Sequence, residues 1–393
     1  MSGEETEPVG PQASLATVAR EWTRIGITGF GGPPAHIALL RELVVKRMGW
    51  MDAQAFEDAN AACGLLPGPA STQLAIFSAY RVAGPAGAIV GGLGFVVPAV
   101  VLILALSVLF LGHAPPLWVR GAGAGAGAAV AAVAVQAARG LLGPSCARVK
   151  EHRARATRWF IYLIVGTAAA ALLGGYLVFA LLACGLLELL LRHESLPNLG
   201  TRTSPLGLFL PASITTGGFG ALAWTAFKVG ALSFGGGFVI IPLMQTDAVH
   251  TYHWMTNPQF LNAVALGQIT PGPVVATVAA VGYAAHGLAG GLLAAAVAFT
   301  PSFSFILLGG QRFERIRANT SARAFLDGAG PAAIGAILGA AITLATALTE
   351  AWQFAVLAAA AITLLVLKRG VVLTLIGAAI IGVIAALAGA SLP

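Results

Sequence analysis

The chain has 393 residues, of which 58% are hydrophobic and only 9% are charged, and its mean hydropathy is +0.86. So little polar surface excludes a soluble globular protein of this length and predicts an all-α, polytopic membrane protein. The net charge of +7 comes from Lys and Arg in short loops between apolar segments. This distribution indicates the positive-inside rule and argues against a nucleic-acid partner.

In chain order, a polar tail of residues 1–16 comes first, and we expect it to be disordered and cytoplasmic because it lacks the parts of a signal peptide. Residues 17–191 form the first of two expected domains, residues 192–216 a linker, and residues 217–393 the second domain. The apolar segments lie near residues 17–40, 59–80, 84–112, 117–142, 159–191, 206–245, 259–284, 287–309, 325–349, 352–367 and 370–392.

We expect about 10 to 13 membrane segments from these lengths. Two regions leave the number open. Residues 159–191 hold either one tilted helix or two short ones, and residues 206–222 are apolar enough to add a crossing.

Two signatures recur 204 residues later in the chain. Phe30-Gly31-Gly32 matches Phe234-Gly235-Gly236, and Pro67-Gly68-Pro69 matches Pro271-Gly272-Pro273. The same offset also pairs Gly26 with Gly230, Ile37 with Ile241, Leu39 with Leu243, Trp50-Met51 with Trp254-Met255, Phe56 with Phe260 and Gly87 with Gly291. An ungapped register of this length indicates a duplication, which is typical of secondary transporters.

Loop charges predict that the two copies have opposite orientations. The basic loop 143–158 should be cytoplasmic, which places the uncharged turn 112–116 on the far side. Its counterpart in the second copy, residues 310–324, carries four arginines. Residues 41–52 are basic, whereas 245–256 contain only Asp247 and histidines. Each element is therefore expected on one side of the membrane in one copy and on the other side in the second, as in an inverted repeat.

The prolines of both signatures must interrupt helices, because proline removes an amide donor and clashes with the preceding turn. The predicted break residues are Pro33, Pro67, Gly68, Pro69, Pro271, Gly272 and Pro273. Broken or re-entrant helices in a bilayer are tolerated only where the freed backbone is buried in protein or lines a polar cavity.

Each break should also leave a helix N-terminus near the middle of the membrane. Pro34 and Pro69 suit the first position of a new helix, and the second copy should supply two more ends, after Gly237 and at Pro273. Such ends bind anions. Four of them, with the glycines Gly31, Gly32, Gly235, Gly236 and Gly237, would suit a small, doubly charged oxyanion. The alternative is that these glycines and prolines only allow kinks and close packing.

Two cations occupy the same place in the repeat, Arg24 and Lys228, each two residues before a matched glycine. Lys228 is the only charge between residues 203 and 246, and at a helix centre it would cost roughly 2.5 to 3.5 kcal/mol to insert. Both are predicted to attract the anion, and the alternative is that they snorkel to an interface.

Further candidates are acids and polar side chains near the breaks. Glu42 and Asp247 lie one position out of strict register, and they either carry protons in an antiport cycle or pair with a nearby arginine or a broken helix end. The candidate hydrogen-bond donors to the oxyanion are Ser71, Thr72, Gln73, Thr277 and Gln268. For the first four, capping of the first helical turn is the alternative.

Residues 121–126, Gly-Ala-Gly-Ala-Gly-Ala, superficially fit a dinucleotide fingerprint. We reject it, because no strand precedes it and no acid follows about 20 residues on. Gly121 and Gly125 instead predict a small-residue face for helix packing. The three cysteines and scattered histidines show no metal or disulfide spacing. With no catalytic triad or phosphate loop either, we predict no metal, no cofactor and no enzymatic activity.

At this point the residues resemble the chromate ion transporter family, in its two-domain form. The resemblance covers both halves and rests on paired motifs, which are Arg24-Ile-Gly26, Phe30-Gly-Gly-Pro-Pro-Ala-His36-Ile, Leu66-Pro-Gly-Pro-Ala-Ser-Thr-Gln73, Lys228-Val-Gly230, Phe234-Gly-Gly-Gly237, Gly267-Gln-Ile-Thr-Pro-Gly-Pro273 and Gly282-Tyr283. One position departs from the pattern: Gly64 stands where glutamine is expected, while Gln268 keeps it in the second copy.

The resemblance implies a secondary active transporter in the bacterial inner membrane that exports chromate and confers chromate resistance. It also implies sulfate as a competing ligand, and we add the lipid bilayer and a second copy in a homodimer as expected partners. The alternative functions are a sulfate or oxyanion permease, or an anion channel on the same scaffold. A membrane-embedded chromate reductase would need a cofactor motif or a redox cysteine pair, which the sequence lacks.

Overall fold

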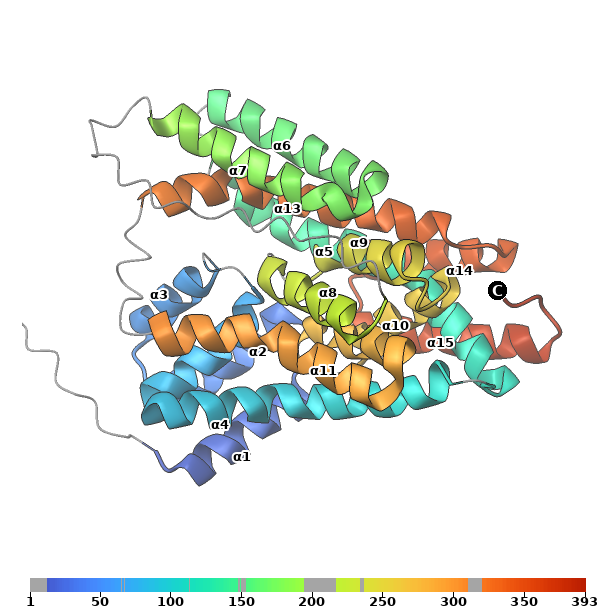
Figure 1. The fold of residues 1–393 in the computed structure, drawn as a ribbon, viewed down its shortest axis with the longest axis horizontal. Coiled ribbons are helices and arrows are strands. Elements are labelled where there is room, and N and C mark those ends of the chain that lie inside the picture. The colour runs from blue at the N-terminus through green and yellow to red at the C-terminus, as the bar shows by residue number, and fades with distance from the viewer. Residues whose placement is uncertain are drawn as a thin grey trace, which may run out of the picture.

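The structure is a computed structural model that describes residues 13–64, 66, 68–112, 114–147, 149, 153–193, 217–233, 237–309 and 320–393. The described residues form helices and turns and contain no strand (Figure 1). The prediction of an all-α polytopic membrane protein is confirmed. Several predicted features lie outside the described residues, namely Pro67, Gly235, Gly236, the tail before residue 13, residues 194–216 of the linker and most of the basic turn 310–324.

The described residues of the first half form seven α-helices and two short helical segments of other kinds. They are α1 (Leu15–Thr28), α2 (Pro33–Arg41), the π-helical η1 (Glu42–Arg47), α3 (Ala53–Cys63), α4 (Ala70–Phe110), α5 (Leu117–Ala147), α6 (Arg153–Leu172), the 3-10 turn η2 (Gly174–Tyr176) and α7 (Leu177–His193). Residues 159–191, left open by the sequence, therefore belong to two helices.

The second half follows the same order. Its described elements are α8 (Phe219–Leu232), α9 (Ile240–Gln245), the π-helical η4 (Thr246–Thr251), α10 (Asn257–Ile269), the 3-10 turn η5 (Val274–Ala276), α11 (Thr277–Gly309), α13 (Thr320–Thr346), α14 (Ala351–Ala361), the π-helical η7 (Ile362–Val366) and α15 (Val371–Leu387). Among the described residues, α4, α5, α13 and residues 274–309 are long and apolar enough to cross a membrane.

Equivalent elements of the two halves repeat unusual backbone features. The π-helical segments η1 and η4 begin 204 residues apart. Both α4 and α11 are interrupted by a kink, at Ala83–Gly84 and at His286–Gly287, and both glycines have φ +63°. This left-handed conformation favours glycine because it lacks a Cβ. The halves therefore share local structure as well as sequence.

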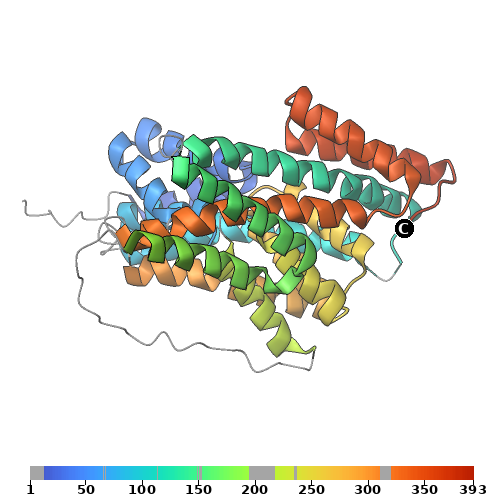
Figure 2. The same cartoon turned by 90° about the horizontal axis from the view of Figure 1, so that it is seen from above.

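Outer helices of each half pack on a long helix of the other. Helices α6 and α7 lie along α13, and α14 and α15 lie along α5 (Figure 2). A Cβ on Gly121 or Gly125 would meet backbone atoms of α15, so these glycines allow close contact. The predicted packing role of the glycine run is confirmed. Helices α5 and α13 run in opposite directions (Figures 1 and 2), as expected of inverted copies, whose orientation in a membrane stays a prediction.

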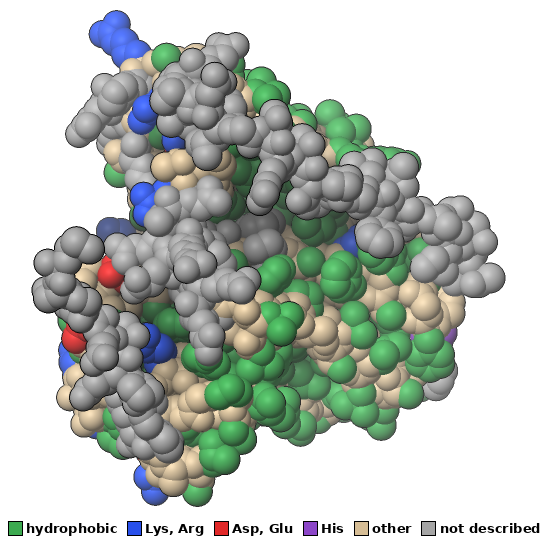
Figure 3. All heavy atoms as spheres, turned by 60° about the vertical axis from the view of Figure 1, so that its left-hand side comes forward, with side chains coloured by type: hydrophobic (Ala, Val, Ile, Leu, Met, Phe, Trp, Pro, Cys, Tyr) green, Lys and Arg blue, Asp and Glu red, His purple; other side chains and the backbone are tan. Residues whose placement is uncertain are grey.

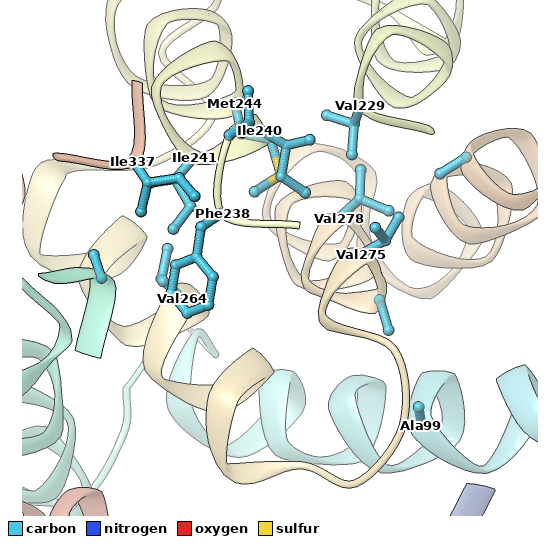
Figure 4. Packing of buried hydrophobic residues seen from close by; sticks show 14 of the residues in the cluster. Ala99, Val229, Phe238, Ile240, Ile241, Met244, Val264, Val275, Val278 and Ile337 are labelled. Carbon is cyan, nitrogen blue, oxygen red and sulfur yellow. The ribbon is translucent and has the colours of Figure 1, made fainter. Parts of the chain in front are cut away.

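The apolar core extends between the halves. Phe238, Ile240 and Met244 lie among side chains of α8, α10 and α11, and Ala99 of α4 lies beside the connection between α10 and α11 (Figure 4). On the outside, hydrophobic side chains cover much of the face shown in Figure 3, and charged side chains gather mainly at its left edge. An apolar surface of this kind suits contact with lipid.

Candidate functional site

The described residues of the signatures lie between the end of one helix and the start of the next. Helix α1 ends at Thr28 and α2 begins at Pro33, whereas α8 ends at Leu232 and α9 begins at Ile240. Gly31 and Gly32 have φ values of +104° and +72°, which explains glycine at both positions. Among the described residues, helices end and begin around the predicted break positions, with one shift. Helix α2 begins at Pro33 and not at Pro34, and Pro69 is the residue before α4.

The breaks of the two halves interlock. The Gly272 amide of the second half donates a hydrogen bond of 3.0 Å to the carbonyl oxygen of Gly29 in the first. Reciprocally, a Cβ on Gly68 would lie 3.3 Å from the carbonyl oxygen of Gly230. Gly68 and Gly272 are in left-handed conformations, with φ +117° and +95°. Each Pro-Gly-Pro loop is therefore packed against the broken helix of the opposite half.

His36 connects two of these ends. Its Nε2 lies 2.9 Å from the carbonyl oxygen of Gly29, and its Nδ1 lies 3.3 Å from Ser71 Oγ. The ring is completely buried and packs edge-on against Phe95. The sequence had suggested no role for His36 beyond its place in a motif. In the structure it fixes the loop after α1 against the first turn of α4.

Buried hydroxyl groups surround the interlocked breaks. Ser302 Oγ and Gln73 Nε2 both lie against Gly68, where a Cβ would come within 3.3 and 2.8 Å of them. Ser233 Oγ lies near Gly237, 3.8 Å from where its Cβ would be. Among the described residues, the hydroxyls of Thr72, Ser233 and Ser302 are completely buried and have no hydrogen-bond partner. Because burying an unsatisfied hydroxyl costs about 1 to 3 kcal/mol, this cluster is suited to donate to a ligand.

The helix starts at the breaks lack side-chain caps. Ser14, Asp52 and Thr256 cap the starts of α1, α3 and α10, which lie away from the breaks. In contrast, no side chain caps α2 or α4. Helix α2 offers no amide at its start, because Pro33 and Pro34 have no N–H and the amides of Ala35 and His36 donate to the Gly32 carbonyl oxygen. The first amides of α4 are left for another acceptor, and an anion is a favourable one.

The expectation of four equivalent helix ends is only partly met. In the second half α9 has six residues, and the 3-10 turn η5 precedes α11. Helix α9 runs directly into η4, as α2 runs into η1, so the two Phe-Gly-Gly breaks precede similar helical segments. Of the two Pro-Gly-Pro breaks, only the first precedes a regular α-helical start, since the tight turn η5 has poorer hydrogen-bond geometry.

Lys228 is paired with Asp247. Its Nζ lies 2.5 Å from Asp247 Oδ2, which also accepts a hydrogen bond of 2.8 Å from Thr225 Oγ1. The carboxylate is buried, and Nζ lies 5.9 Å from the centre of the Trp224 ring. Two residues predicted for separate roles thus form one ion pair. Lys228 faces a partner, as its isolation in an apolar stretch required, but its charge is already neutralised.

Arg24 is in a different position. It is exposed on α1, beside Arg20, Thr23 and Ile27 of the same helix. In this half an ion pair instead joins Glu21 of α1, which also contacts Arg20, to Arg47 of η1. The sequence expectation of two equivalent cations facing one anion is therefore not met in this structure.

The two ion pairs connect equivalent elements with opposite polarity. In the first half the acid is on α1 and the base on η1, whereas in the second half the base is on α8 and the acid on η4. Each pair joins the helix before a Phe-Gly-Gly break to the segment after it. Glu42, the other candidate proton carrier, is exposed and pairs with Lys46 at 2.9 Å.

The remaining polar candidates have mixed surroundings. Thr277 Oγ1 donates to the Val274 carbonyl oxygen at 2.7 Å, which differs from the capping alternative, in which the hydroxyl would accept from an amide. Ser71 contacts His36, and Gln73 is completely buried beside Gly68. Gln268 Nε2 is buried with no partner among the described residues.

Sequence reasoning missed Ser233 and Ser302. The repeat gives no signal for them, because Gly29 and Pro98 occupy the matching positions. The only available signal was a serine inside an otherwise apolar segment.

Comparison with known proteins agrees with this arrangement. The family model described as "Chromate transporter" matches residues 16–189 and 220–383, one region in each half. The chain belongs to the chromate transporter family. No solved structure matches the chain.

Relatives are similar over most of their length. A chromate transport protein of Cupriavidus metallidurans is 32% identical over 387 residues, covering 95% of this chain and 94% of the relative. One of Pseudomonas aeruginosa is 30% identical over 361 residues, covering 88% and 84%. A probable chromate transport protein of Synechococcus elongatus is 28% identical over 347 residues, covering 86% of each chain. The resemblance stated from the motifs is confirmed.

Proposed function

We propose that this member of the family is a secondary active transporter that exports chromate across the bacterial inner membrane and confers chromate resistance. The observation that carries the proposal is the site where the breaks of both halves interlock. It combines the unpartnered hydroxyls of Thr72, Ser233 and Ser302 with the uncapped start of α4. Relatives named as chromate transport proteins supply the substrate.

The site suits a tetrahedral dianion. Hydroxyls and backbone amides donate hydrogen bonds to oxyanion oxygens, and such bonds are stronger when the acceptor is charged. Binding of the dianion at this site does not require a free lysine or arginine, because helix N-termini carry partial positive charge. Two inverted copies that pack on each other would let the halves rock around this site and expose it to either side in turn.

The membrane potential supports the export direction. One elementary charge moved through 100 mV corresponds to about 2.3 kcal/mol, so a dianion gains roughly 4.6 kcal/mol per 100 mV on leaving an inside-negative cell. Uptake against this potential would need cotransported cations. Asp247, the buried candidate for carrying a proton, is engaged by Lys228.

Flux of radiolabelled chromate into inside-out vesicles tests the proposal. We expect accumulation that sulfate reduces and that changes when the proton gradient is removed. Flux that only equilibrates chromate, whatever the proton gradient, would indicate the anion channel. Sulfate flux without chromate flux would indicate the sulfate permease. Vesicles no more permeable to chromate than vesicles without the protein would refute transport.

Replacing Ser302 with alanine tests the site itself. We expect KM for chromate to rise about fivefold, the effect of losing one hydrogen bond of about 1 kcal/mol. Stability should be unchanged or slightly higher, because the variant removes a buried hydroxyl without a partner. Vesicle flux and thermal unfolding in detergent give the two values.

Ser107→Ala is the matched control. Ser107 is also completely buried, but its Oγ donates to the Ile103 carbonyl oxygen of the same helix at 2.8 Å. KM should stay within twofold of the wild-type value. If Ser302→Ala transports chromate with unchanged KM, the hydroxyl does not bind the substrate.

A further inference from the structure

A second polar cavity lies at the end of the molecule where α5, α10 and α14 begin. Its volume is about 750 Å³, and its polar lining comes from Arg120, Thr256, Gln259, Asn262 and Gln353. Among the described residues that line it, none is an aspartate or a glutamate. We call this cavity the vestibule.

Most of the polar groups in the vestibule already have partners. Thr256 and Gln259 cap the start of α10 reciprocally. Gln353 donates to the Ala124 carbonyl oxygen at 3.3 Å, and its Oε1 accepts from the amides of Thr349 and Glu350. These residues therefore hold α10 and α14 in place and have little capacity left for a ligand.

Arg120 and Asn262 are different. Neither makes a side-chain hydrogen bond or an ion pair with any described residue. This includes Pro393, which also lines the vestibule. Arg120 is exposed and Asn262 is half-buried. An unpaired guanidinium and an unpaired amide in one cavity are a suitable donor set for an oxyanion, because guanidinium binds such groups with two parallel hydrogen bonds.

The glycines of α5 bring Asn262 close to this helix. A Cβ on Gly123 would lie 2.7 Å from Asn262 Nδ2, and one on Gly127 would lie 3.4 Å from Asn262 Oδ1. Any larger residue at Gly123 would push the amide away from the α5 backbone. The run of small residues that sequence analysis assigned to packing thus also shapes the vestibule wall.

The position of Arg120 disfavours a purely structural role. It lies in the first turn of α5, where the helix dipole makes a cation unfavourable by about 0.3 to 1 kcal/mol and favours an anion. The repeat gives Ala324 and Asp58 at the positions that match Arg120 and Asn262. The fold therefore forms at the other end without this cation, so its presence here needs another reason.

Helix α10 links the vestibule to the helix breaks. Its start, at Asn257, follows the lining residue Thr256, and its end, at Ile269, adjoins the second Pro-Gly-Pro loop. Loop charges predict the vestibule on the external side, because the turn 112–116 is its neighbour.

We propose that the vestibule is an anion-binding station on the transport path, in which Arg120 and Asn262 hold a tetrahedral oxyanion on its way from the helix breaks. The identity of its ligand, chromate, rests on the proposed function. It predicts that charge at residue 120 controls binding at one mouth of the transporter, separately from the site at the breaks.

Substitution of Arg120 tests the station in reconstituted vesicles. Arg120→Gln should raise KM for chromate about tenfold, as expected for one lost charged contact, with the maximal rate within twofold of wild type. Arg120→Lys should recover most of the affinity. Arg369→Gln is the control, because Arg369 is also exposed and its side chain has no partner among the described residues. An unchanged KM in Arg120→Gln would overturn the proposal.

A cysteine at position 120 separates charge from structure. In a Cys146→Ser background, Arg120→Cys is treated with a cationic or an anionic methanethiosulfonate reagent of similar size. The cationic reagent should restore KM toward the wild-type value, and the anionic reagent should raise it further. Equal effects of both reagents would mean that position 120 senses bulk and not charge, which would refute the station.

A third test measures how far a bound anion protects the cysteine of Arg120→Cys from modification, and it does not depend on transport. Chromate, or sulfate as a redox-inert analogue, should slow modification of Arg120→Cys relative to chloride at equal ionic strength. If the vesicles carry no chromate but the cysteine is protected, the proposed function fails and the anion station stands. If chromate flux is normal and neither anion protects, the station fails alone.

Discussion

Lys228→Ala is expected to reduce chromate transport to less than one tenth of wild type and to destabilise the protein by about 3 kcal/mol or more. The physical reason is Asp247, whose carboxylate is buried and would lose the ammonium group 2.5 Å away. Its other partner, the Thr225 hydroxyl, cannot neutralise the charge. Vesicle flux at equal protein level and thermal unfolding in detergent measure the two effects.

The double variant Lys228→Ala/Asp247→Ala distinguishes a structural from a functional lysine. Removing both charges leaves no unpaired charge, although the Thr225 hydroxyl loses its acceptor, so most of the lost stability should return. If Lys228 only neutralises Asp247, transport should return as well. If Lys228 also attracts the dianion, transport should stay low in the stable double variant. A single variant as stable and as active as wild type would contradict the buried pair.

The two ion pairs have equivalent places in the two halves, so the test on Lys228 also bears on the first half. Glu21–Arg47 and Lys228–Asp247 both join the helix before a break to the π-helical segment after it. Each therefore restrains the two sides of one Phe-Gly-Gly break. A transporter that rocks its halves must keep these breaks at fixed geometry while the contacts between halves change, and an ion pair whose acid is buried helps to hold that geometry.

Gly230→Ala is expected to have the second large effect, the loss of a stable fold. A Cβ at position 230 would overlap the carbonyl oxygen of Ala298 in the adjacent α11. Backbone cannot move aside as a flexible side chain does, so α8 and α11 must separate, at a cost of about 3 kcal/mol or more. The same separation would displace Gly68, which packs on the Gly230 carbonyl. Yield of folded protein and thermal unfolding measure the effect.

Gly220→Ala, in the same helix, is the matched control. Nothing lies within 4 Å of a Cβ at position 220. Alanine also favours the helical state over glycine by about 1 kcal/mol, so this variant should be as stable as wild type or slightly more so. A Gly230→Ala variant that matches it in stability and transport would show that α8 and α11 are not packed as the structure has them.

Part of the candidate site could be predicted because it depends on local chemistry. Proline and glycine interrupt a helix wherever they occur, so the breaks near Gly31, Gly68 and Gly272 followed from the residues alone. Lys228 was singled out because an isolated charge in an apolar segment needs a partner. The partner itself could not be predicted, since Asp247 is one position out of the repeat register and lies on another element.

Other residues escaped because their significance depends on neighbours distant in the chain. Ser302 matters through its contact with Gly68, and Arg120 through a cavity whose opposite wall is α10. Arg24 was assigned to the interior by analogy with Lys228. A helix turns by about 100° per residue, so only the packed structure shows which face is buried.

The sequence by itself determined the class of the protein, its duplication, the places where helices break and its resemblance to the chromate transporters. These properties follow from composition, local backbone preferences and recurring motifs, which need no knowledge of packing. Only the tertiary structure decided which breaks interlock, that Lys228 pairs with Asp247, which hydroxyls lack partners, and that Arg120 faces an open cavity. Each of these depends on contacts between segments far apart in the chain, whose geometry is set by how the helices of the two halves pack.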